Sequence, residues 1–425
     1  MTDNHIPRMM RVRQKFPASR PLDIRATVQQ EFARARLPIK PGAQIAVAVG
    51  SRGITHLQTI VASVLEVLKS AGTKPFIVPA MGSHGGATPE GQVELLAEYG
   101  ITESHLQVPI RSNMEVERLA VIEDGFDVFF SAEALRADGI LVVNRVKPHT
   151  DFASTSLGSG LLKMLVVGLG KRTGAANYHR TSVHLGFEPV IRKFARVILQ
   201  SAPVLGGLAI VEDQFHQTAR LTLLAREEME EREGELFAEA KRLMPKLPFD
   251  DIDLLIVDRI GKNISGSGMD PNIIGRGIHG YLTSLQTQRQ MHPVIRRLFV
   301  RDLTPETHGN AIGVGLADFT TTRLVGAMDP QKTYINSLTS LSLASAKIPI
   351  HFETDREAIT QALASLAVAD ISRTRIVRIA DTLSLEKVAV SQAYEPEFQR
   401  RSDLEVLNPP EEMKFDSQAN LLPLG

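Results

Sequence analysis

The chain contains no cysteine. It therefore forms no disulfide, no zinc–thiolate site and no cysteine-bound iron–sulfur cluster. Any metal must be held by His, Asp or Glu, or by a cofactor that brings its own sulfur ligands. Residues 1–20 lack the apolar core of a signal peptide, and no apolar run reaches the roughly 18 residues that span a bilayer. We therefore expect a cytoplasmic protein with no membrane segment.

An excess of either charge is also missing, since 48 Lys and Arg residues balance 48 Asp and Glu residues. Nucleic acids and anionic membranes select basic surfaces, so we expect neither as a partner. A local basic pocket for one small anion remains compatible with this balance. Hydrophobic residues make up 43% of the chain and charged residues 23%, which is typical of a globular protein.

Strand and helix patterns alternate along the first half of the chain. Apolar, β-branched runs predict strands over 44–49, 75–79, 139–144 and 206–211, and helical spacing predicts helices over 56–69, 88–99 and 187–200. Thr88 is expected to cap the second of these helices, with Gln92 near the capping-box distance. Such alternation predicts a mostly parallel sheet that is covered by helices on both faces.

A second set of elements follows a charged helix over 226–243, which is expected to be solvated and to link two domains. Strands are predicted over 252–257, 309–316, 376–379 and 388–390, with a helix over 355–366 and an extended tail from about 395. The predicted fold class is α/β with two domains, each with a mostly parallel sheet flanked by helices, and with the active site in the cleft between them. The expected boundaries are a catalytic domain over 1–224, a helical linker over 225–249 and a domain over 250–425 that closes over the site.

Three polar side chains each follow one of the first three predicted strands: Arg52, His84 and His149. Parallel strands place such loops at one edge of a sheet, where ligands bind in open α/β folds. Arginine binds a carboxylate with two parallel hydrogen bonds, and a pair of histidines can act as acid and base at neutral pH. Taken singly, each residue is equally typical of a solvated loop or a rigid turn.

Glycine-rich segments provide further candidates. Gly158 and Gly160 precede an apolar run that contains Lys163, and backbone amides there could cradle a phosphate at a helix N-terminus. The segment 261–272 is a polar, glycine-rich loop in which Lys262 is the only cation, and we expect it to contact a substrate. A flexible loop or turn is the alternative for both segments. His179 and His184 are five residues apart, which does not match the spacing of a zinc-binding helix.

At these residues the chain resembles the nickel-pincer lactate racemase family, closely in the first half and more loosely in the second. The resemblance is carried by the Arg52 loop, Gly82-Ser83-His84, Lys147-Pro148-His149, Lys163 and Tyr178-His179. The most specific feature is the spacing of 16 residues between Lys163 and His179.

The resemblance implies a cofactor and a metal ligand. Lys163 would be joined through a thioamide to a nickel-pincer nucleotide, a pyridinium mononucleotide that binds nickel with its own sulfur and carbon atoms. His179 would be the protein's ligand to nickel, and Lys147 would lie near the cofactor. Cofactor biosynthesis proteins would then be partners. This would explain how a chain without cysteine could hold a sulfur-ligated metal.

The resemblance also implies a reaction on a small 2-hydroxy acid. Arg52 would hold the substrate carboxylate, and His84 and His149 would exchange the hydroxyl proton while hydride moves to and from the cofactor. The chain departs from the family where Gly50 and Ser51 precede Arg52, and where the stretch between His149 and Lys163 is a few residues longer. These differences leave the substrate open between lactate, another 2-hydroxy acid and a sugar acid.

Two other classes of function remain compatible with the same residues. One is a nickel-free dehydrogenase or hydrolase, although no glycine fingerprint for a dinucleotide follows a first strand. The other is a protein that only binds a small carboxylate or phosphate, for which two proton-carrying histidines are not needed. A homo-oligomer is compatible with the sequence, and a stable one would need an exposed apolar patch.

Overall fold

The structure is a computed structural model, which describes residues 6–17, 19–50, 53–150, 154, 156–279 and 292–424. The chain forms two compact units. The N-terminal unit contains the described residues of 18–149 and 153–244, and the C-terminal unit contains those of 1–17 and 245–425 together with Thr150.

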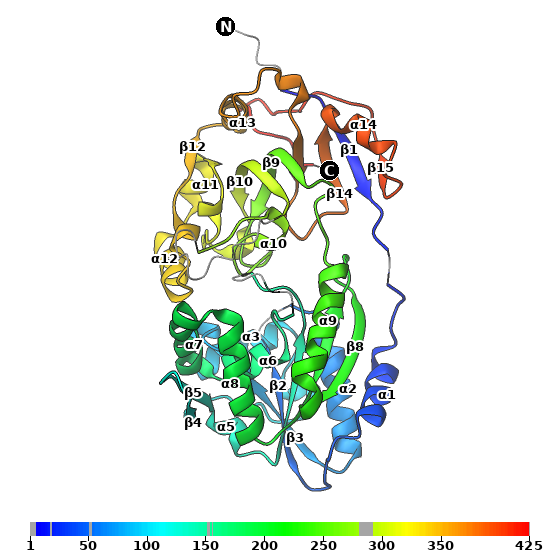
Figure 1. The fold of residues 1–425 in the computed structure, drawn as a ribbon, viewed down its shortest axis with the longest axis vertical. Coiled ribbons are helices and arrows are strands. Elements are labelled where there is room, and N and C mark those ends of the chain that lie inside the picture. The colour runs from blue at the N-terminus through cyan, green and yellow to red at the C-terminus, as the bar shows by residue number, and fades with distance from the viewer. Residues whose placement is uncertain are drawn as a thin grey trace. The chain divides into compact units, whose positions relative to one another are not determined.

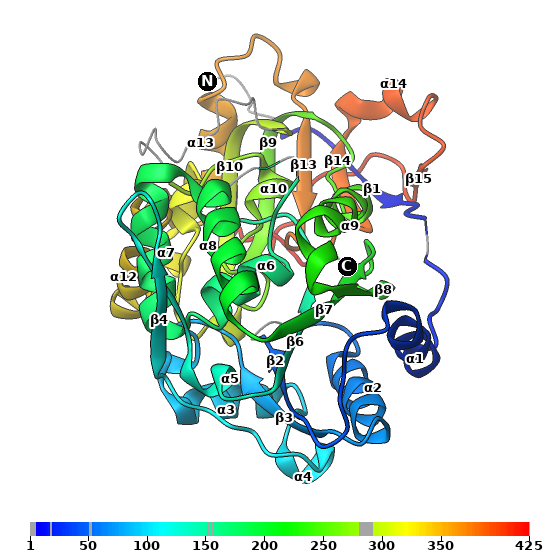
Figure 2. The same cartoon turned by 60° about the horizontal axis from the view of Figure 1, so that its bottom comes forward.

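The sheet of the N-terminal unit, coloured from blue to green in Figure 1, has five strands in the order β3-β2-β6-β7-β8, all of which are labelled in Figure 2. Its strands are β2 (Gln44–Val49), β3 (Lys74–Pro79), β6 (Gly139–Arg145), β7 (Val204–Glu212) and β8 (Thr218–Ala225). The first four pair in parallel, and β8 pairs antiparallel with β7. Most residues of β2, β3 and β6 are buried, because both faces of these strands are covered.

Helices cover both faces of this sheet. The unit contains α1 (Ile24–Ala35), α2 (Leu57–Ser70), α3 (Pro89–Glu98), α4 (Glu103–Leu106), α5 (Ala132–Leu135), α6 (Leu161–Lys163), α7 (Lys171–Leu185), α8 (Phe187–Ser201) and α9 (Met229–Leu243). Helices α1 and α2 lie side by side (Figure 2) and share one core with the side chains of Ile45, Val47 and Leu141. Helix α9 packs against β7, β8 and α6. A hairpin of β4 (Val116–Val121) and β5 (Asp127–Ser131) contacts α7 and α8.

Helix α9 differs from the solvated linker that its charges predicted. Met229, Glu233, Leu236 and Phe237 are all buried. These four residues lie on one face of an amphipathic helix, and the other charged residues of the helix lie on the opposite face. The segment 225–244 is therefore part of the N-terminal unit.

The C-terminal unit contains an eight-stranded sheet in the order β12-β11-β10-β9-β13-β14-β1-β15. Its strands are β1 (Met9–Gln14), β9 (Asp251–Ile260), β10 (Val294–Leu303), β11 (Phe319–Thr321), β12 (Ile350–Phe352), β13 (Ile376–Ile379), β14 (Lys387–Ser391) and β15 (Leu404–Val406). The run from β12 to β13 is parallel, and the other pairings are antiparallel. Its helices are α10 (Pro271–Ile274), α11 (Thr322–Ala327), α12 (Pro330–Thr339), α13 (Asp355–Ala364) and α14 (Glu395–Phe398).

The predicted α/β fold class with mostly parallel sheets and flanking helices is confirmed. Two local predictions in the C-terminal unit are wrong. Residues 309–316 form turns and a short 3₁₀-helix instead of a strand, because Gly309 and Gly313 have the positive φ angles of turns. The tail after residue 395 also contains α14 and β15, since Leu404–Val406 pairs with β1. No helix among the described residues is long and apolar enough to cross a membrane.

Candidate active site

The ends of β2, β3 and β6 meet a short π-helix, Met164–Gly168, at the carboxyl edge of the N-terminal sheet. A Cβ atom placed on Gly50, just after β2, would lie 2.7 Å from the Met164 side chain. A Cβ atom on Gly168 would lie 2.6 Å from Ala80 O, just after β3. The missing side chain of Gly168 lets the segment after Lys163 pack against the end of β3, whereas the neighbour of Gly50 is the flexible end of the Met164 side chain. Single-turn π-helices are frequent at functional sites.

Lys163 and His149 are in direct contact at this edge. The Lys163 amine lies within hydrogen-bonding contact of His149 Nε2. His149 is buried and Lys163 is half-buried. The loop between them is closed by a pair of backbone hydrogen bonds between Lys147 and Ser159, each 2.8 Å long. Three candidates from the sequence, Lys147, His149 and Lys163, are therefore brought together.

The His84 loop follows β3 and packs on the same π-helix. Gly82 N donates to Gly168 O at 3.1 Å, and Gly82 has a left-handed φ of 60° that favours glycine. His84 itself is half-buried and directly precedes the turn of Gly85–Ala87. The structure thus places His84 in a loop anchored to the segment that begins after Lys163.

His179 lies on α7, one helical turn after a residue that packs on the His84 loop. Ala175 Cβ is 3.5 Å from the position of a Cβ atom on Gly82, and His179 follows Ala175 by one helical turn. The ring of His179 makes edge contacts with Tyr178 and Phe187, at centroid distances of 5.1 and 6.3 Å. An imidazole held by two aromatic rings has few rotamers available, which suits a metal ligand.

Gly158 and Gly160 allow close packing. A Cβ atom on Gly158 would lie 2.2 Å from Lys147 O, and one on Gly160 would lie 2.0 Å from Glu233 Oε1. The carboxylate of Glu233 accepts a hydrogen bond from Leu162 N at 2.9 Å, which is the position that a phosphate would take at the start of α6. A carboxyl group of the chain therefore occupies the place of the predicted phosphate.

The structure does not test the two predicted substrate residues. Arg52 lies outside the described residues. Lys262 lies in the C-terminal unit, where its amine donates to Gly266 O at 2.8 Å within its own loop. Their roles stay predictions.

Sequence reasoning missed three buried polar residues around the cluster: Gln92, Lys171 and Glu233. Gln92 was expected near a capping box, but its amide donates to Gly82 O at 2.9 Å while Thr88 alone caps α3. Lys171 follows the short segment Gly168-Leu169-Gly170, which by itself predicts no buried lysine. For Glu233 the signal was present, because it occupies the apolar face of α9.

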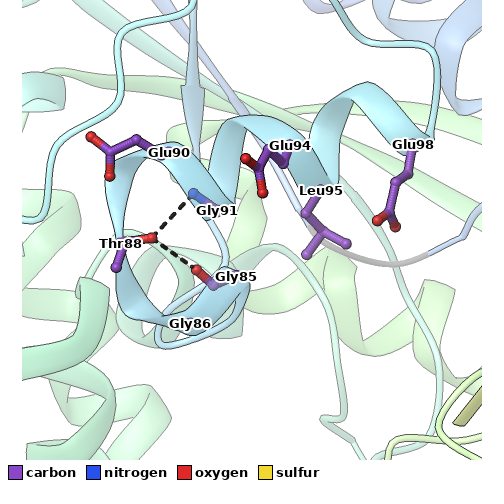
Figure 3. A pocket seen from close by; sticks show the side chains of 8 residues that line it. All are labelled: Gly85, Gly86, Thr88, Glu90, Gly91, Glu94, Leu95 and Glu98. Carbon is purple, nitrogen blue, oxygen red and sulfur yellow. Dashed lines mark hydrogen bonds between the residues drawn. The ribbon is translucent and has the colours of Figure 1, made fainter. Parts of the chain in front are cut away.

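A pocket of about 530 Å³ lies beside the His84 loop. Figure 3 shows Glu90, Glu94 and Glu98 along α3 at its rim, with Thr88 hydrogen-bonded to Gly85 and Gly91. A carboxylate or phosphate ligand would be repelled by three acidic side chains. This pocket is therefore unsuited to the anionic substrate that the cluster around Lys163 suggests.

The chain has an α/β fold with two units. The polar cluster lies in the first unit, at the carboxyl edge of its mostly parallel sheet. Comparison of the sequence with known protein families and with characterised proteins finds no match. Among solved structures, the fold is similar to the lactate racemase apoprotein from Thermoanaerobacterium thermosaccharolyticum, with a TM-score of 0.52 and 14% identity over 91% of this chain and 95% of that chain. A protein from Thermotoga maritima gives a TM-score of 0.48 and 12% identity over 78% of this chain and 84% of that chain. The first likeness shows a lactate-racemase-like fold, and the second is too weak to support an argument.

The residues of the cluster fit a nickel-pincer nucleotide. The cofactor would need an amine for its covalent link and an imidazole for its metal, and Lys163 and His179 have these groups. Within the described parts of the chain, no cluster of three or more His, Asp or Glu side chains could hold a metal ion.

Proposed function

We propose that the chain is a racemase or epimerase of a small 2-hydroxy acid that depends on a nickel-pincer nucleotide linked to Lys163. The observation that carries the proposal is the contact between Lys163 and His149, with the His84 loop packed on the π-helix that follows Lys163. The lactate-racemase-like fold supports the proposal, because the fold and the polar cluster both point to the same kind of reaction. Nickel is the expected metal, with His179 as the protein's ligand.

His149 has a role in the attachment of the cofactor and in the reaction. The Lys163 amine must lose a proton before it can form the thioamide link, and its contact with His149 Nε2 supports this imidazole as the proposed acceptor of that proton. Once Lys163 is joined to the cofactor through the thioamide, its nitrogen would carry no charge, and the imidazole of His149 would be available to the substrate. When bound, the cofactor supplies a hydride acceptor.

His84 and His149 are the proposed acid/base pair. In each direction one imidazole takes the hydroxyl proton from the reacting enantiomer, and the other imidazole supplies a proton as the opposite enantiomer forms. Burial of His149 and the packed loop around His84 keep bulk water from the reacting carbon. Arg52 is the proposed partner of the substrate carboxylate, with Lys262 as a further contact.

The first test is expression with the cofactor biosynthesis enzymes, followed by intact-mass and nickel measurements. We expect a mass adduct on Lys163 and a stoichiometric amount of nickel. The Lys163→Ala variant should lose both, because it lacks the amine, whereas Lys193→Ala, which changes an exposed lysine on α8, should keep both. An adduct that persists in Lys163→Ala would disprove the attachment site.

The same preparations test the reaction. Incubation with single-enantiomer 2-hydroxy acids should yield the opposite enantiomer, and His84→Gln should reduce the rate by about 10²–10⁴-fold while it keeps adduct and nickel. An unmodified, nickel-free chain that turns over a substrate would instead indicate a dehydrogenase or hydrolase. Binding of a carboxylate or phosphate without turnover would indicate a binding protein.

A further inference from the structure

Lys171 combines two unfavourable features at the first position of α7. Its side chain is fully buried, and its backbone has a left-handed φ of 54°, which is strained for a residue with a Cβ atom. Burial lowers the pKa of its amine to about 8, against the opposing charge of Glu133. Both features lower the stability of the folded protein, which is a reason to look for a function of Lys171.

The hydrogen bonds of Lys171 lead to the His84 loop. Its amine donates to Pro79 O at 2.7 Å, at the end of β3, and to Gln92 Oε1 at 3.3 Å. Gln92 is fully buried, and its amide donates to Gly82 O at 2.9 Å and to His84 O at 3.4 Å. One ammonium group thus links α7 to the start of the loop directly and to its end through Gln92.

The acceptors of this ammonium group are both neutral. Other buried cations of the described chain, such as Arg301 and Arg378, are paired with aspartates. Lys171 bonds instead to a backbone carbonyl and a side-chain amide. Such hydrogen bonds fix the positions of the groups that they join, but the buried, unpaired charge lowers stability. Functional sites commonly combine these two effects.

We propose that Lys171 is a positioning residue that, through Gln92, fixes the His84 loop relative to the helix that carries His179. The inference rests on the proposed function, in which His84 moves a proton and His179 binds nickel. Loss of the link leaves both histidines in place but lets their separation vary. Small displacements of an acid/base group lower the rate more than they lower substrate binding.

The Gln92→Glu variant tests the link without loss of the fold. A carboxylate at this position keeps the bond to Lys171 and neutralises its charge, but it cannot donate to Gly82 O or His84 O. We expect a melting temperature that is unchanged or higher, faster hydrogen–deuterium exchange in the segment 80–92, and a kcat lowered about ten-fold with little change in KM.

Lys171→Met removes the link at its other end and should show the same exchange and kinetic effects. Arg172→Met is the matched control, because it removes a positive charge from the exposed neighbouring position of α7 and should leave exchange and kcat unchanged. Hydrogen exchange is measured on the chain without cofactor. It therefore tests whether Lys171 and Gln92 hold the His84 loop even if the adduct and turnover tests contradict the proposed function. Parental exchange in segment 80–92 together with parental kcat in folded Gln92→Glu and Lys171→Met would overturn the inference.

Discussion

Glu233 is a fully buried carboxyl group directly beside the segment that contains Lys163. Burial raises its pKa from an ordinary 4.5 to about 7, although the backbone N–H groups of Leu162 and Leu161 and the charge of Arg192 act in the opposite direction. The folded protein therefore holds this proton more tightly than the unfolded chain does. The stabilisation is complete below pH 4.5 and is lost as the pH rises towards 7.

Glu233→Gln should abolish this pH dependence, because the amide keeps an acceptor for Leu162 N and cannot ionise. We expect similar stability of parent and variant near pH 4.5, and a variant that is more stable by about 3 kcal/mol above pH 7. The measurement is denaturant unfolding across this pH range. Glu235→Gln changes an exposed carboxylate on the same helix and should follow the parent. A parental pH slope in Glu233→Gln would show that this carboxyl group does not titrate as described.

At the scale of elements, α9 packs against the segment around Gly158, which precedes Lys163. Phe237 is buried on its inner face, 2.7 Å from the position of a Cβ atom on Gly158. Gly158 in turn lies against Lys147 O. The helix that looked like a charged linker is therefore the element that holds the Lys147–Ser159 bridge in place.

Phe237→Ala should destabilise the N-terminal unit by about 3–5 kcal/mol, because it leaves a cavity under this loop. Denaturant unfolding measures the loss, and hydrogen exchange of the Lys147 and Ser159 amides should accelerate at the same time. Glu235→Ala, on the exposed face of α9, should change stability by less than about 0.5 kcal/mol. Unchanged exchange of the Lys147 and Ser159 amides would show that α9 does not stabilise this bridge.

At the scale of the whole molecule, each unit has its own buried network. In the C-terminal unit, Asp355 accepts hydrogen bonds from Arg301 at 2.7 Å, from Arg323 at 3.1 Å and from Leu421 N at 2.8 Å. Arg301 also pairs with Asp258 at 3.0 Å. This network ties α13, β9 and β10 to the end of the chain, whereas the polar cluster of the candidate site lies in the N-terminal unit.

Asp355→Asn should destabilise the C-terminal unit by about 3–5 kcal/mol, since it leaves the buried Arg301 without full compensation. Hydrogen exchange by mass spectrometry should accelerate in segments such as 251–260 and 294–303 and stay unchanged in 44–49 and 74–79. Glu357→Gln, at an exposed position of the same helix, is the control. Equal acceleration in both units would mean that they unfold as one cooperative block.

Much of the parallel core follows from the sequence. The apolar runs at Gln44–Val49 and Gly139–Arg145 form strands because their side chains can be buried on both faces, and the polar loops after them lie at the carboxyl edge of the sheet. Thr88 caps α3 as its position before Pro89 predicts. Local pattern and composition determine these features, because they depend on residues close in the chain.

Other features exist only through contacts between distant segments. Met9–Gln14 becomes a strand because β14 and β15 pair with it on either side, and no local pattern reports such partners. Lys171, Gln92 and Glu233 are polar residues whose burial depends on what packs around them. Composition and short-range spacing thus determined the fold class, the family resemblance added Lys163 and His179 to the candidate residues, and tertiary packing alone decided which ionisable groups lost their water. The physical reason is that desolvation and strand pairing depend on neighbours in space, which a short window of sequence does not contain.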